Sequence, residues 1–434
     1  MFEGSVSSGL QHTPCGNFLV YPLGSVVVVR TVVSGKHTFL DAGVSGKVSF
    51  LALSKDGRYL ATGHETAVVA KAEAIIWDLK KVIDNCCADR CLLHCLQQHL
   101  GKVQTLDFSC DGKYLVTLGG QDDNDLVVWD VEKGTAICGS PAANDTSLCV
   151  KWLNQRNDRF VTCGNYHFRV WQVCTSTPKM HAVDANMGSM RRVMQCLSIS
   201  SDDLFGFAGS KTGEILKFRL ERDDIKAFDK PDDKRPTLEA YNRERFSKAA
   251  TSVECVINPS TGNTNVIAGA GDGTVCLLNP KLQLIPSHKV KLTGAVTSIS
   301  LAPDSKSFQT GTELSQRYSL DISTFTPRLT GTCHYSEIYD VKFPKDCSDL
   351  FVTASVQDIR VWLMKDHQEV LRIKVPNVSC YAIDITSQGS SIVSAWSDGK
   401  IRSFYPETGE SHFIIPDAHP DSVTCLTLCN DDCK

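Results

Sequence analysis

Apolar and polar residues alternate in short runs along most of the chain, and the same order of runs recurs. The clearest copies are residues 46–63 and 101–119, where an alternating run, an Asp-Gly pair and a second apolar run follow one another. Alternation with a period of two is typical of half-buried β-strands, and Asp-Gly favours a tight turn between them. In both copies a third run ends in Trp-Asp, at Trp77-Asp78 and at Trp129-Asp130. Each copy therefore predicts three strands, and a fourth, looser strand would complete a four-stranded sheet.

The copies recur about every 45 residues, and a WD repeat has a length of about 40–45 residues. Where the Trp-Asp signature decays, the third strand keeps its register, and Trp171, Phe218, Leu278 or Phe404 takes the tryptophan position. We therefore predict an all-β fold, a WD-repeat β-propeller. The first-strand positions that anchor this alignment are Val48, Val103, Leu148, Val193, Val253, Val296, Ile338, Val378 and Val423.

The number of copies predicts two rings of blades. Residues 17–22, 25–30 and 37–40 predict three strands without a first partner, as in propellers that borrow a strand from the far end of the chain. With this partial blade, residues 1–330 supply one seven-bladed ring, with an insertion at about 221–250. Residues 331–434 would then begin a second, incomplete ring, because the copy from Val423 has room for little more than one strand. The chain is thus expected to be part of a longer protein, and the strand that closes each ring stays open.

Composition removes several classes of function. The net charge of −4 and the lack of a long basic run argue against broad nucleic-acid binding. The first ten residues do not resemble a signal peptide, and the longest aliphatic run, Val26–Val29, is too short to cross a bilayer. We therefore expect a soluble cytoplasmic protein without membrane contacts. Many of the 19 cysteines stand singly in apolar runs, which favours reduced thiols that pack as small apolar groups.

The copy that begins at Val103 carries a polar set typical of WD blades. His99 precedes the first strand, Thr117 lies on the second, Asp123 in the next turn and Trp129 on the third. In WD blades such residues form a buried hydrogen-bonded chain, so we interpret these four as a structural blade tetrad without a catalytic role. His334 and His419 stand at the same offset before later copies, and we interpret them in the same way.

Motifs for metals, nucleotides and catalysis are weak or missing. The cluster Cys86, Cys87, Cys91, His94 and Cys95 contains no Cys-x-x-Cys pair, and an extended strand would separate its members. The glycine run 269–273 is followed by a strand pattern, so no helix N-terminus is offered to a phosphate. We find no nucleophile elbow, no His-Glu-x-x-His and no Walker loop. The sequence therefore predicts no cofactor, no metal, no small-molecule substrate and no enzymatic activity.

Two basic segments are candidate partner contacts. Arg191 and Arg192 precede the strand anchored at Val193, and Lys230, Lys234 and Arg235 lie in the charged insertion. Propellers usually bind partners through loops on a rigid frame, and these side chains would suit an acidic partner. The alternative is that the insertion is only a solvated loop.

Longer segments carry a more specific resemblance. They are residues 21–24, 120–130, 136–143, 358–362, 369–377, 394–402 and 406–409. Together they resemble the cilia- and flagella-associated protein fifty-two family, in one order over nearly the whole chain. The resemblance implies two tandem seven-bladed propellers, of which this chain supplies the first and part of the second. It also implies a place in the lumen of the doublet microtubules of motile cilia, with tubulin and other microtubule inner proteins as partners. The charged insertion around Pro231 and the lack of most of the second ring depart from the family pattern.

The leading hypothesis is therefore a non-catalytic structural protein of the ciliary axoneme that stabilises doublet microtubules. The alternative is a cytosolic WD-repeat adaptor that recognises peptide motifs through a basic or aromatic cavity at one ring opening. An enzyme would instead show clustered ionisable residues with perturbed pKa values at a funnel mouth.

Overall fold

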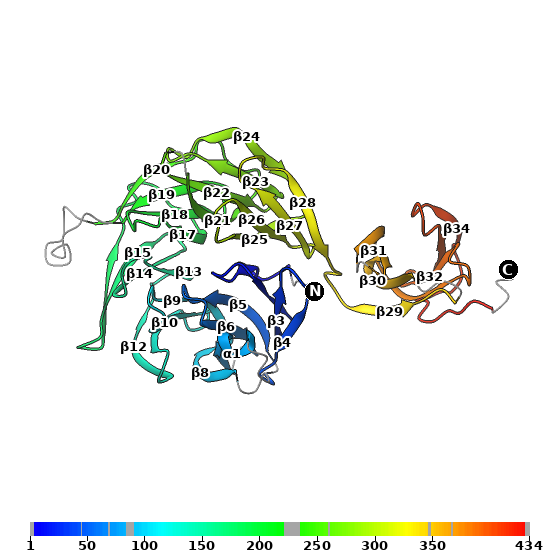
Figure 1. Ribbon diagram of the computed structural model, residues 1–434, viewed down its shortest axis with the longest axis horizontal. Coiled ribbons are helices and arrows are strands. Elements are labelled where there is room, and N and C mark those ends of the chain that lie inside the picture. Colours follow the sequence, from blue (N-terminus) through cyan, green and yellow to red (C-terminus); the bar gives the residue numbers. More distant parts are fainter. Residues whose placement is uncertain are drawn as a thin grey trace. The chain divides into compact units, whose positions relative to one another are not determined.

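The computed structural model describes residues 4–44, 46–67, 70–83, 91–220, 235–258, 261–345, 349–365 and 368–429. The chain divides into two compact units, Met1–Thr330 and Gly331–Lys434. These ranges contain eight antiparallel sheets, in which strands that follow one another in the sequence are neighbours (Figure 1). One short helix, α1 Leu79–Ile83, lies between two strands. The prediction of an all-β chain is confirmed.

Unit 1 holds seven four-stranded sheets, each with the up-and-down strand order expected of a propeller blade. In chain order they are β1 Gln11–His12, β2 Phe18–Leu23, β3 Val26–Thr31 and β4 His37–Leu40; β5 Lys47–Leu53, β6 Tyr59–Glu65, β7 Lys71–Asp78 and β8 Leu92–Leu100; β9 Val103–Phe108, β10 Tyr114–Gly119, β11 Asp125–Asp130 and β12 Thr135–Pro141; β13 Ser147–Trp152, β14 Arg159–Gly164, β15 Phe168–Cys174 and β16 Lys179–Asp184; β17 Met194–Ile199, β18 Phe205–Ser210, β19 Ile215–Arg219 and β20 Thr237–Tyr241; β21 Ala250–Ile257, β22 Thr264–Ala270, β23 Thr274–Leu278 and β24 Leu284–Lys291; and β25 Val296–Leu301, β26 Ser307–Thr312, β27 Gln316–Asp321 and β28 Pro327–Thr332.

The Asp-Gly turns have a local cause that the sequence already contains. Between β9 and β10, Gly112 has a φ of 71°, a left-handed conformation that glycine adopts at little cost. The Ser109 hydroxyl donates to Asp111 at 2.8 Å and accepts the backbone N–H of Tyr114 at 3.0 Å. The turn between β5 and β6 repeats this arrangement with Ser54, Asp56 and Gly57. The Ser-x-Asp-Gly sequence therefore fixes where the second strand begins.

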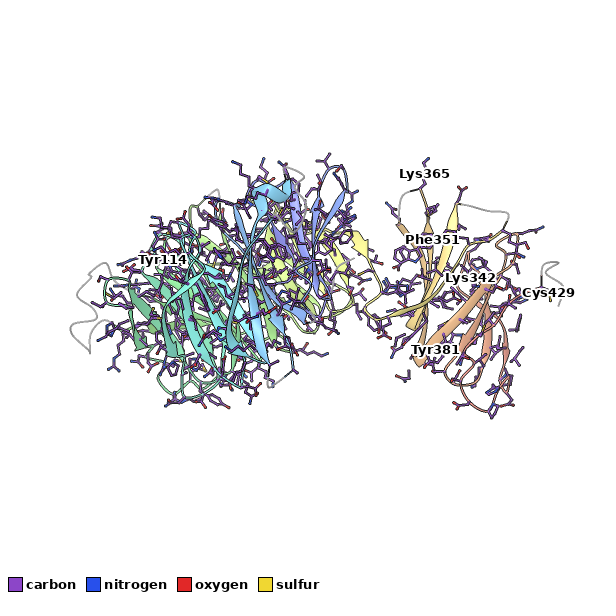
Figure 2. The ribbon with its side chains drawn as sticks, turned by 90° about the horizontal axis from the view of Figure 1, so that it is seen from below. Tyr114, Lys342, Phe351, Lys365, Tyr381 and Cys429 are labelled. Carbon is purple, nitrogen blue, oxygen red and sulfur yellow. The ribbon has the colours of Figure 1, made fainter. Side chains whose placement is uncertain are left out.

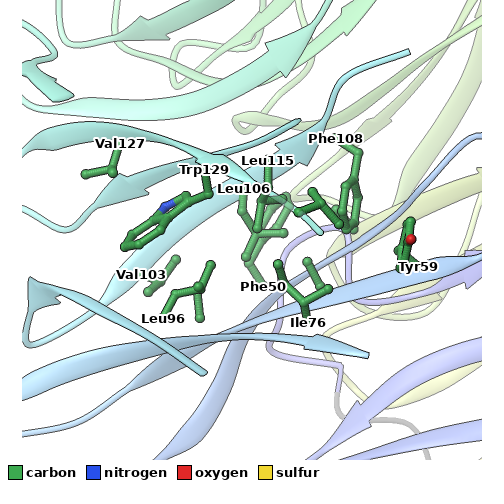
Figure 3. Packing of buried hydrophobic residues seen from close by; sticks show 14 of the residues in the cluster. Phe50, Tyr59, Ile76, Leu96, Val103, Leu106, Phe108, Leu115, Val127 and Trp129 are labelled. Atoms are coloured by element: carbon green, nitrogen blue, oxygen red, sulfur yellow. The ribbon is translucent and has the colours of Figure 1, made fainter. Parts of the chain in front are cut away.

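Apolar side chains from neighbouring sheets form one core cluster for each pair. Between the sheets β5–β8 and β9–β12, Phe50, Ile76 and Leu96 pack against Leu106 and Trp129 (Figure 3). Similar clusters join the other consecutive sheets of unit 1. The predicted tryptophan positions are all buried: Trp77, Trp129, Trp171, Phe218 and Leu278 in unit 1 and Phe404 in unit 2.

Several cysteines belong to these clusters, as the sequence predicts. Cys163 and Cys276 are buried among apolar side chains, and all cysteines in the described ranges are free thiols. Burial raises the pKa of Cys276 to about 12, so its thiol stays neutral at physiological pH.

The first strands of the seven sheets are tied to one another by side-chain to backbone hydrogen bonds. Each bond joins one first strand to the first strand of the neighbouring sheet, and the seventh sheet is bonded back to the first. The pairs are Gln11 with the Leu51 carbonyl (2.7 Å), Ser49 with the Val103 carbonyl (2.6 Å), Asp107 with the Trp152 N–H (2.7 Å), Cys149 with the Gln195 carbonyl (3.0 Å), Ser198 with the Cys255 N–H (3.2 Å), Thr251 with the Val296 carbonyl, and Ser300 with the His12 N–H (2.9 Å). The first strands of all seven sheets also line one cavity of about 550 Å³.

The first sheet corrects one prediction. Its three expected strands are present, but they do not lack a first partner, because β1 pairs with β2 in the register Gln11↔Val20 and His12↔Leu19. The sheet therefore borrows no strand from the far end of the chain. A two-residue strand is too short to show an alternating pattern, which is why the sequence did not reveal it.

The insertion is shorter than predicted. Residues 237–241, which the prediction placed outside the blades, form β20 and pair with β19 as the outer strand of the fifth sheet. The residues before them, 221–234, lie outside the described ranges. The charged composition of the segment hid this strand, because an outer strand is mostly exposed and needs no apolar face.

Unit 2 holds one six-stranded sheet with the order β29 to β34. The strands are β29 Ile338–Lys342, β30 Leu350–Leu363, β31 Gln368–Ile385, β32 Ile392–Trp396, β33 Ile401–Phe404 and β34 Ser411–Ile415. Within β30, the indole of Trp362 donates to Thr353 at 2.8 Å, although nine extended residues would span about 30 Å. The chain therefore folds back near Gln357, whose φ is 64°, and β30 is a tight hairpin.

Aromatic side chains line this sheet. The ring of Phe351 lies 5.5 Å from that of Phe343 and 6.0 Å from that of Trp362, and the ring of Tyr381 lies 5.1 Å from that of Tyr339. Phe351 and Tyr381 are labelled in Figure 2. The strand predicted from Val423 is absent, since residues 416–429 have no strand. The segment is nevertheless held to the sheet, because the Leu428 N–H donates to Asp384 at 2.7 Å. Asp340 accepts the Ile383 N–H at 3.0 Å in a similar way.

Candidate protein-binding surfaces

The structure brings the four residues of the predicted blade tetrad together. His99 Nδ1 lies 3.0 Å from Asp123 Oδ2, His99 Nε2 lies 2.7 Å from Thr117 Oγ1, and Trp129 Nε1 donates to Thr117 Oγ1 at 2.9 Å. Because the carboxylate only accepts, Nδ1 carries the proton and Nε2 accepts the threonine hydroxyl. Burial alone would raise the pKa of Asp123, but the bonds from His99 and from two backbone N–H groups lower it. This hydrogen-bonded chain joins the end of β8, which holds His99, to the second and third strands of the next sheet, β10 and β11.

A second tetrad lies in unit 2, at the position of His334. His334 Nδ1 lies 2.7 Å from Asp358, His334 Nε2 lies 2.6 Å from Thr353, and Trp362 donates to the same Thr353 hydroxyl. Here the fully buried Arg360 also donates to Asp358, at 2.9 Å. Burial would raise the pKa of Asp358, but the hydrogen bonds from His334 and Arg360 outweigh the effect of burial, so the pKa is lowered.

Other sheets keep only part of this chain. Trp171 donates to Thr162 at 2.9 Å, and Trp77 donates to Thr62 at 3.3 Å. In the second sheet the histidine is His64, which lies on the second strand next to Thr62 and not in the preceding loop. His419 does not fit its predicted interpretation: it is exposed, and its Nδ1 accepts the Asp421 N–H. The prediction for His419 was based on its distance in sequence from a strand expected at Val423, and this strand does not form.

In the fifth sheet a buried glutamate takes the place of the aspartate. Glu214 is fully buried and accepts bonds from Arg192 (3.0 Å), from Ser210 (2.7 Å) and from Thr212, and Arg245 lies 3.1 Å away. Burial would raise the pKa of Glu214, but these bonds outweigh it and bring it to about 2. Arg192, predicted as a partner contact, is therefore engaged within its own sheet. Sequence alone missed Glu214, because no tryptophan or histidine marks its sheet.

This glutamate makes the acid stability of unit 1 testable. A carboxyl whose pKa falls from 4.5 to about 2 on folding stabilises the protein above pH 4.5, and that contribution is lost as the pH falls towards 2. We expect Glu214→Gln to be less stable than wild type at pH 7, with a difference that shrinks between about pH 4.5 and pH 2. Denaturant unfolding at several pH values measures it, and Glu239→Gln, at an exposed position of the same sheet, is the matched control. A difference that does not change with pH would contradict the role of this carboxylate.

Arg191 and Arg235, two of the predicted partner contacts, line one hollow of about 680 Å³. It lies at the rim of unit 1 between the fourth and fifth sheets, where Asn186 and Thr237 form a parallel bridge. Tyr166, Arg169 and Asp145 also line it. The other two candidates, Lys230 and Lys234, lie outside the described residues.

The inner cavity of unit 1 contains its own ionisable cluster. Lys151 Nζ lies 3.3 Å from Asp107, whose charge raises the pKa of Lys151. Burial raises the pKa of Glu254 to about 7, with Asp107 adding to the shift and Lys151 opposing it. Perturbed carboxylates of this kind accompany many active sites, and structural ion pairs produce them as well. Here Lys151, from the fourth sheet, bonds to Asp107 of the third, so the pair joins two blades.

Within the part of the chain that the structure describes, the cysteine motif brings no set of metal ligands together. Cys86 and Cys87 lie outside the described residues, Cys91 is buried and His94 Nε2 lies 2.9 Å from the Glu132 carbonyl. Among the described residues, no group of three His, Cys, Asp or Glu side chains could hold a metal ion. Of the glycine run 269–273, the first two residues end β22 and residues 271–273 form the turn to β23.

No helix in the described ranges is both long enough and apolar enough to cross a bilayer.

Comparisons with known proteins agree with this architecture. The family model "WD domain, G-beta repeat" matches residues 90–130, which hold the tetrad of His99. The solved chain titled "Structure of U3-55K" superposes with a TM-score of 0.52 at 18% identity, covering 71% of this chain and 89% of that one. At this identity the likeness shows the fold alone.

The relatives share one name. "Cilia- and flagella-associated protein 52" of Chlamydomonas reinhardtii is 38% identical over 98% of this chain and 65% of its own length. The Homo sapiens protein of this name is 36% identical over all of this chain and 66% of its own length. The Macaca fascicularis protein is 32% identical over all of this chain and 71% of its own length. The chain thus spans about two thirds of these relatives, and it belongs to the cilia- and flagella-associated protein 52 family, a non-catalytic family of WD-repeat proteins.

Proposed function

We propose that this chain is a structural protein of motile cilia, a microtubule inner protein. It would bind tubulin and neighbouring inner proteins in the lumen of axonemal doublet microtubules and stabilise them for motility. The observation that carries this proposal is identity of 36–38% over nearly the whole chain with proteins named for cilia and flagella. The family resemblance of the sequence supplies the lumenal location and the partners.

The architecture supports a scaffold role. We infer that unit 1 is a closed seven-bladed ring, because its seven first strands are tied in a circle in which Ser300 of the seventh sheet accepts the N–H of His12 in the first. We also infer that unit 2 is the beginning of a second ring, since its sheet repeats the tetrad and the ties between first strands. A frame fixed in this way holds its loops in place, so that many weak contacts can act together on one partner.

Charge supports the choice of partner. Tubulin has an acidic surface overall, and the net charge of this chain is only −4, so attraction would come from local basic surfaces. Basic side chains gather at the rim hollow, where Arg169, Arg191 and Arg235 lie with Asp145 and Asp184. A cytosolic adaptor that recognises peptide motifs remains the alternative function that the localisation experiment tests.

Localisation tests this proposal directly. We expect the tagged full-length protein, expressed in ciliated cells, to lie along the axoneme and to stay with the doublets after high-salt extraction. High salt screens contacts between exposed charges, whereas many simultaneous contacts inside a lumen resist it. A known outer-surface axonemal protein is the control that salt should release. A cytoplasmic pattern, or release together with this control, would contradict the lumenal role and favour the adaptor.

A further inference from the structure

The joint between the seventh sheet (β25–β28) and the first sheet (β1–β4) differs from the other six joints of unit 1, and we call it the closing joint. Each of the other joints contains a cluster of buried apolar side chains that both of its sheets supply. Within the described ranges, none of these clusters joins the seventh sheet to the first. Burial of apolar surface is the main source of stability between packed sheets, so the closing joint is held less firmly than the others.

The seventh sheet presents polar side chains to the closing joint. Side chains alternate along a strand, and Ile299 and Phe308 point into the cluster shared with the sixth sheet. Their neighbours Ser298 and Gln309 therefore point the other way, towards the first sheet. Arg317 lies on this same face, because it and Ser298 pair with the same residue of β26. The Ser298 hydroxyl is fully buried and has no hydrogen-bond partner in the part of the chain that the structure describes.

The first sheet places an arginine where other sheets have a tryptophan. Arg30 pairs with Leu19 just as Trp129 pairs with Leu115, and in each case the partner is the second residue of the second strand. The side chain at this position packs against the preceding sheet, as Trp129 does against the second sheet. Arg30 therefore faces the closing joint, and its Nε is buried without a hydrogen-bond partner among the described residues. A polar side chain thus stands where a large apolar ring fills the joint between the second and third sheets.

Residues 4–10 lie against the seventh sheet and lead into β1. The Ser8 N–H donates to the Thr297 carbonyl at 3.0 Å, and the Gly4 N–H donates to the Ser315 hydroxyl at 3.3 Å. The segment therefore fastens the beginning of the first sheet to the seventh sheet through hydrogen bonds.

We propose that unit 1 opens at the closing joint, with residues 4–10 holding it shut, while the other six joints stay packed. Each of the two sheets keeps its own four-stranded hydrogen bonding when they separate, so opening unfolds neither of them. Exposing the polar face of the seventh sheet costs less than exposing an apolar cluster. Opening also gives the buried Ser298 hydroxyl and Arg30 Nε access to water. This inference rests on the closed ring proposed for unit 1 and gives that scaffold one conformational change.

Thiol labelling of the folded full chain tests the proposal, because a buried thiol reacts only when its surroundings open. Val28→Cys and Ser298→Cys, in separate variants, place one thiol on the first sheet and one on the seventh sheet. Both positions are fully buried. Val28 faces the closing joint, because its neighbours Val27 and Val29 point into the cluster shared with the second sheet. Labelling with iodoacetamide and mass spectrometry of the peptides give the rate at each thiol.

Cys163 and Cys276 are the matched controls within the same molecule. They are buried in the joints between the fourth and fifth sheets and between the fifth and sixth sheets. Cys276 lies two residues before the tryptophan position of its strand, as Val28 does. We expect both introduced thiols to react at similar rates, and at least about a hundredfold faster than the two control thiols, because local opening has a smaller free energy than the opening of an apolar core.

Two substitutions in the Val28→Cys chain should change the labelling rate in opposite directions. At Gly4 a Cβ would overlap the Thr312 carbonyl oxygen, so Gly4→Ala has to displace residues 4–10 and should speed labelling at least about fivefold. Arg30→Met removes the buried Nε and adds apolar surface, so it should slow labelling about fivefold. Gly271→Ala is the control for Gly4→Ala, because its Cβ would lie 3.5 Å from the nearest atom, and it should leave the rate unchanged.

Two outcomes would overturn the inference. Introduced thiols that react as slowly as Cys163 and Cys276 would show that unit 1 opens at no preferred joint. A fast thiol on one sheet with a slow thiol on the other would show loosening of one sheet and not separation of the two. Because the assay uses the purified chain and needs no axoneme, its failure leaves the localisation result untouched, and a cytoplasmic location leaves the labelling result untouched.

Discussion

Replacing Asp358 with alanine is expected to lower the free energy of unfolding of unit 2 by about 3 kcal/mol. Asp358 is 2% exposed and accepts a bond from the fully buried Arg360, whose Nη2 already makes no hydrogen bond within the described residues. After the substitution, the Arg360 guanidinium keeps its bond to Glu369. Its Nε, however, is buried without the carboxylate that accepts its hydrogen bond in the wild type. The His334 Nδ1 also loses its acceptor.

Hydrogen exchange measured by mass spectrometry on the full chain follows this loss in the amides of β29 and β30. The next hairpin offers a matched control, because Asp398 forms an ion pair with Arg402 at 2.6 Å but is 26% exposed. Asp398→Ala should cost at most about 1 kcal/mol, as surface pairs contribute little. Equal effects of the two substitutions would show that the cluster around Arg360 is not a desolvated network.

Two threonines at equivalent positions should respond in opposite directions to the same substitution. Thr117 and Thr310 are both fully buried on the second strands of their sheets. Thr117 accepts from Trp129 and bonds to His99, so Thr117→Val would leave two buried polar groups without a partner. The expected loss of stability is about 2–3 kcal/mol.

Thr310 has no tryptophan beside it, because Leu320, which pairs with Phe308, occupies the position that Trp129 has in the third sheet. Its hydroxyl has no hydrogen-bond partner in the described part of the chain. We expect Thr310→Val to be neutral or to stabilise the protein by up to about 1 kcal/mol, because it removes an unsatisfied buried hydroxyl of similar volume. Denaturant unfolding of both variants gives the comparison. A loss of stability in Thr310→Val similar to that in Thr117→Val would contradict the assignment of Thr310 as unsatisfied.

The regular parts of the fold could be read from sequence because they repeat a physical requirement. An inner strand alternates, a tight turn follows it, with Asp-Gly after β5 and β9, and a large side chain fills the joint between sheets. These requirements located the strands anchored at Val48, Val103 and Ile338 and the tetrad of His99. They failed where the requirement is weak: β1 has two residues, β20 is an exposed outer strand, and the hairpin in β30 turns at Gln357 without glycine.

The candidate site was less predictable than the fold. Adjacent in sequence, Arg191 and Arg192 gave the same signal, yet one lines a hollow and the other holds the buried Glu214. The pairing of Arg192 depends on a residue 22 positions away in another turn. Tyr166, which also lines the hollow, carried no signal at all, since its unusual feature is a backbone φ of 61°. Contacts between residues distant in sequence and backbone strain arise only in the folded chain, so the sequence pattern does not reveal them.

The ties between first strands also bear on how such a chain is made. Each tie is a single hydrogen bond between a side chain and a backbone group of neighbouring first strands, so it can form as soon as the two first strands lie side by side. During synthesis on the ribosome, each completed sheet would therefore act as a template that catches the next emerging segment before its own hairpin has formed. Sheets would then be added one after another from the N-terminal side. Only the most recently made segment would be exposed and able to pair with a wrong strand. The last of these hydrogen bonds, between Ser300 and His12, joins segments almost 300 residues apart. It would form last and complete the folding of unit 1.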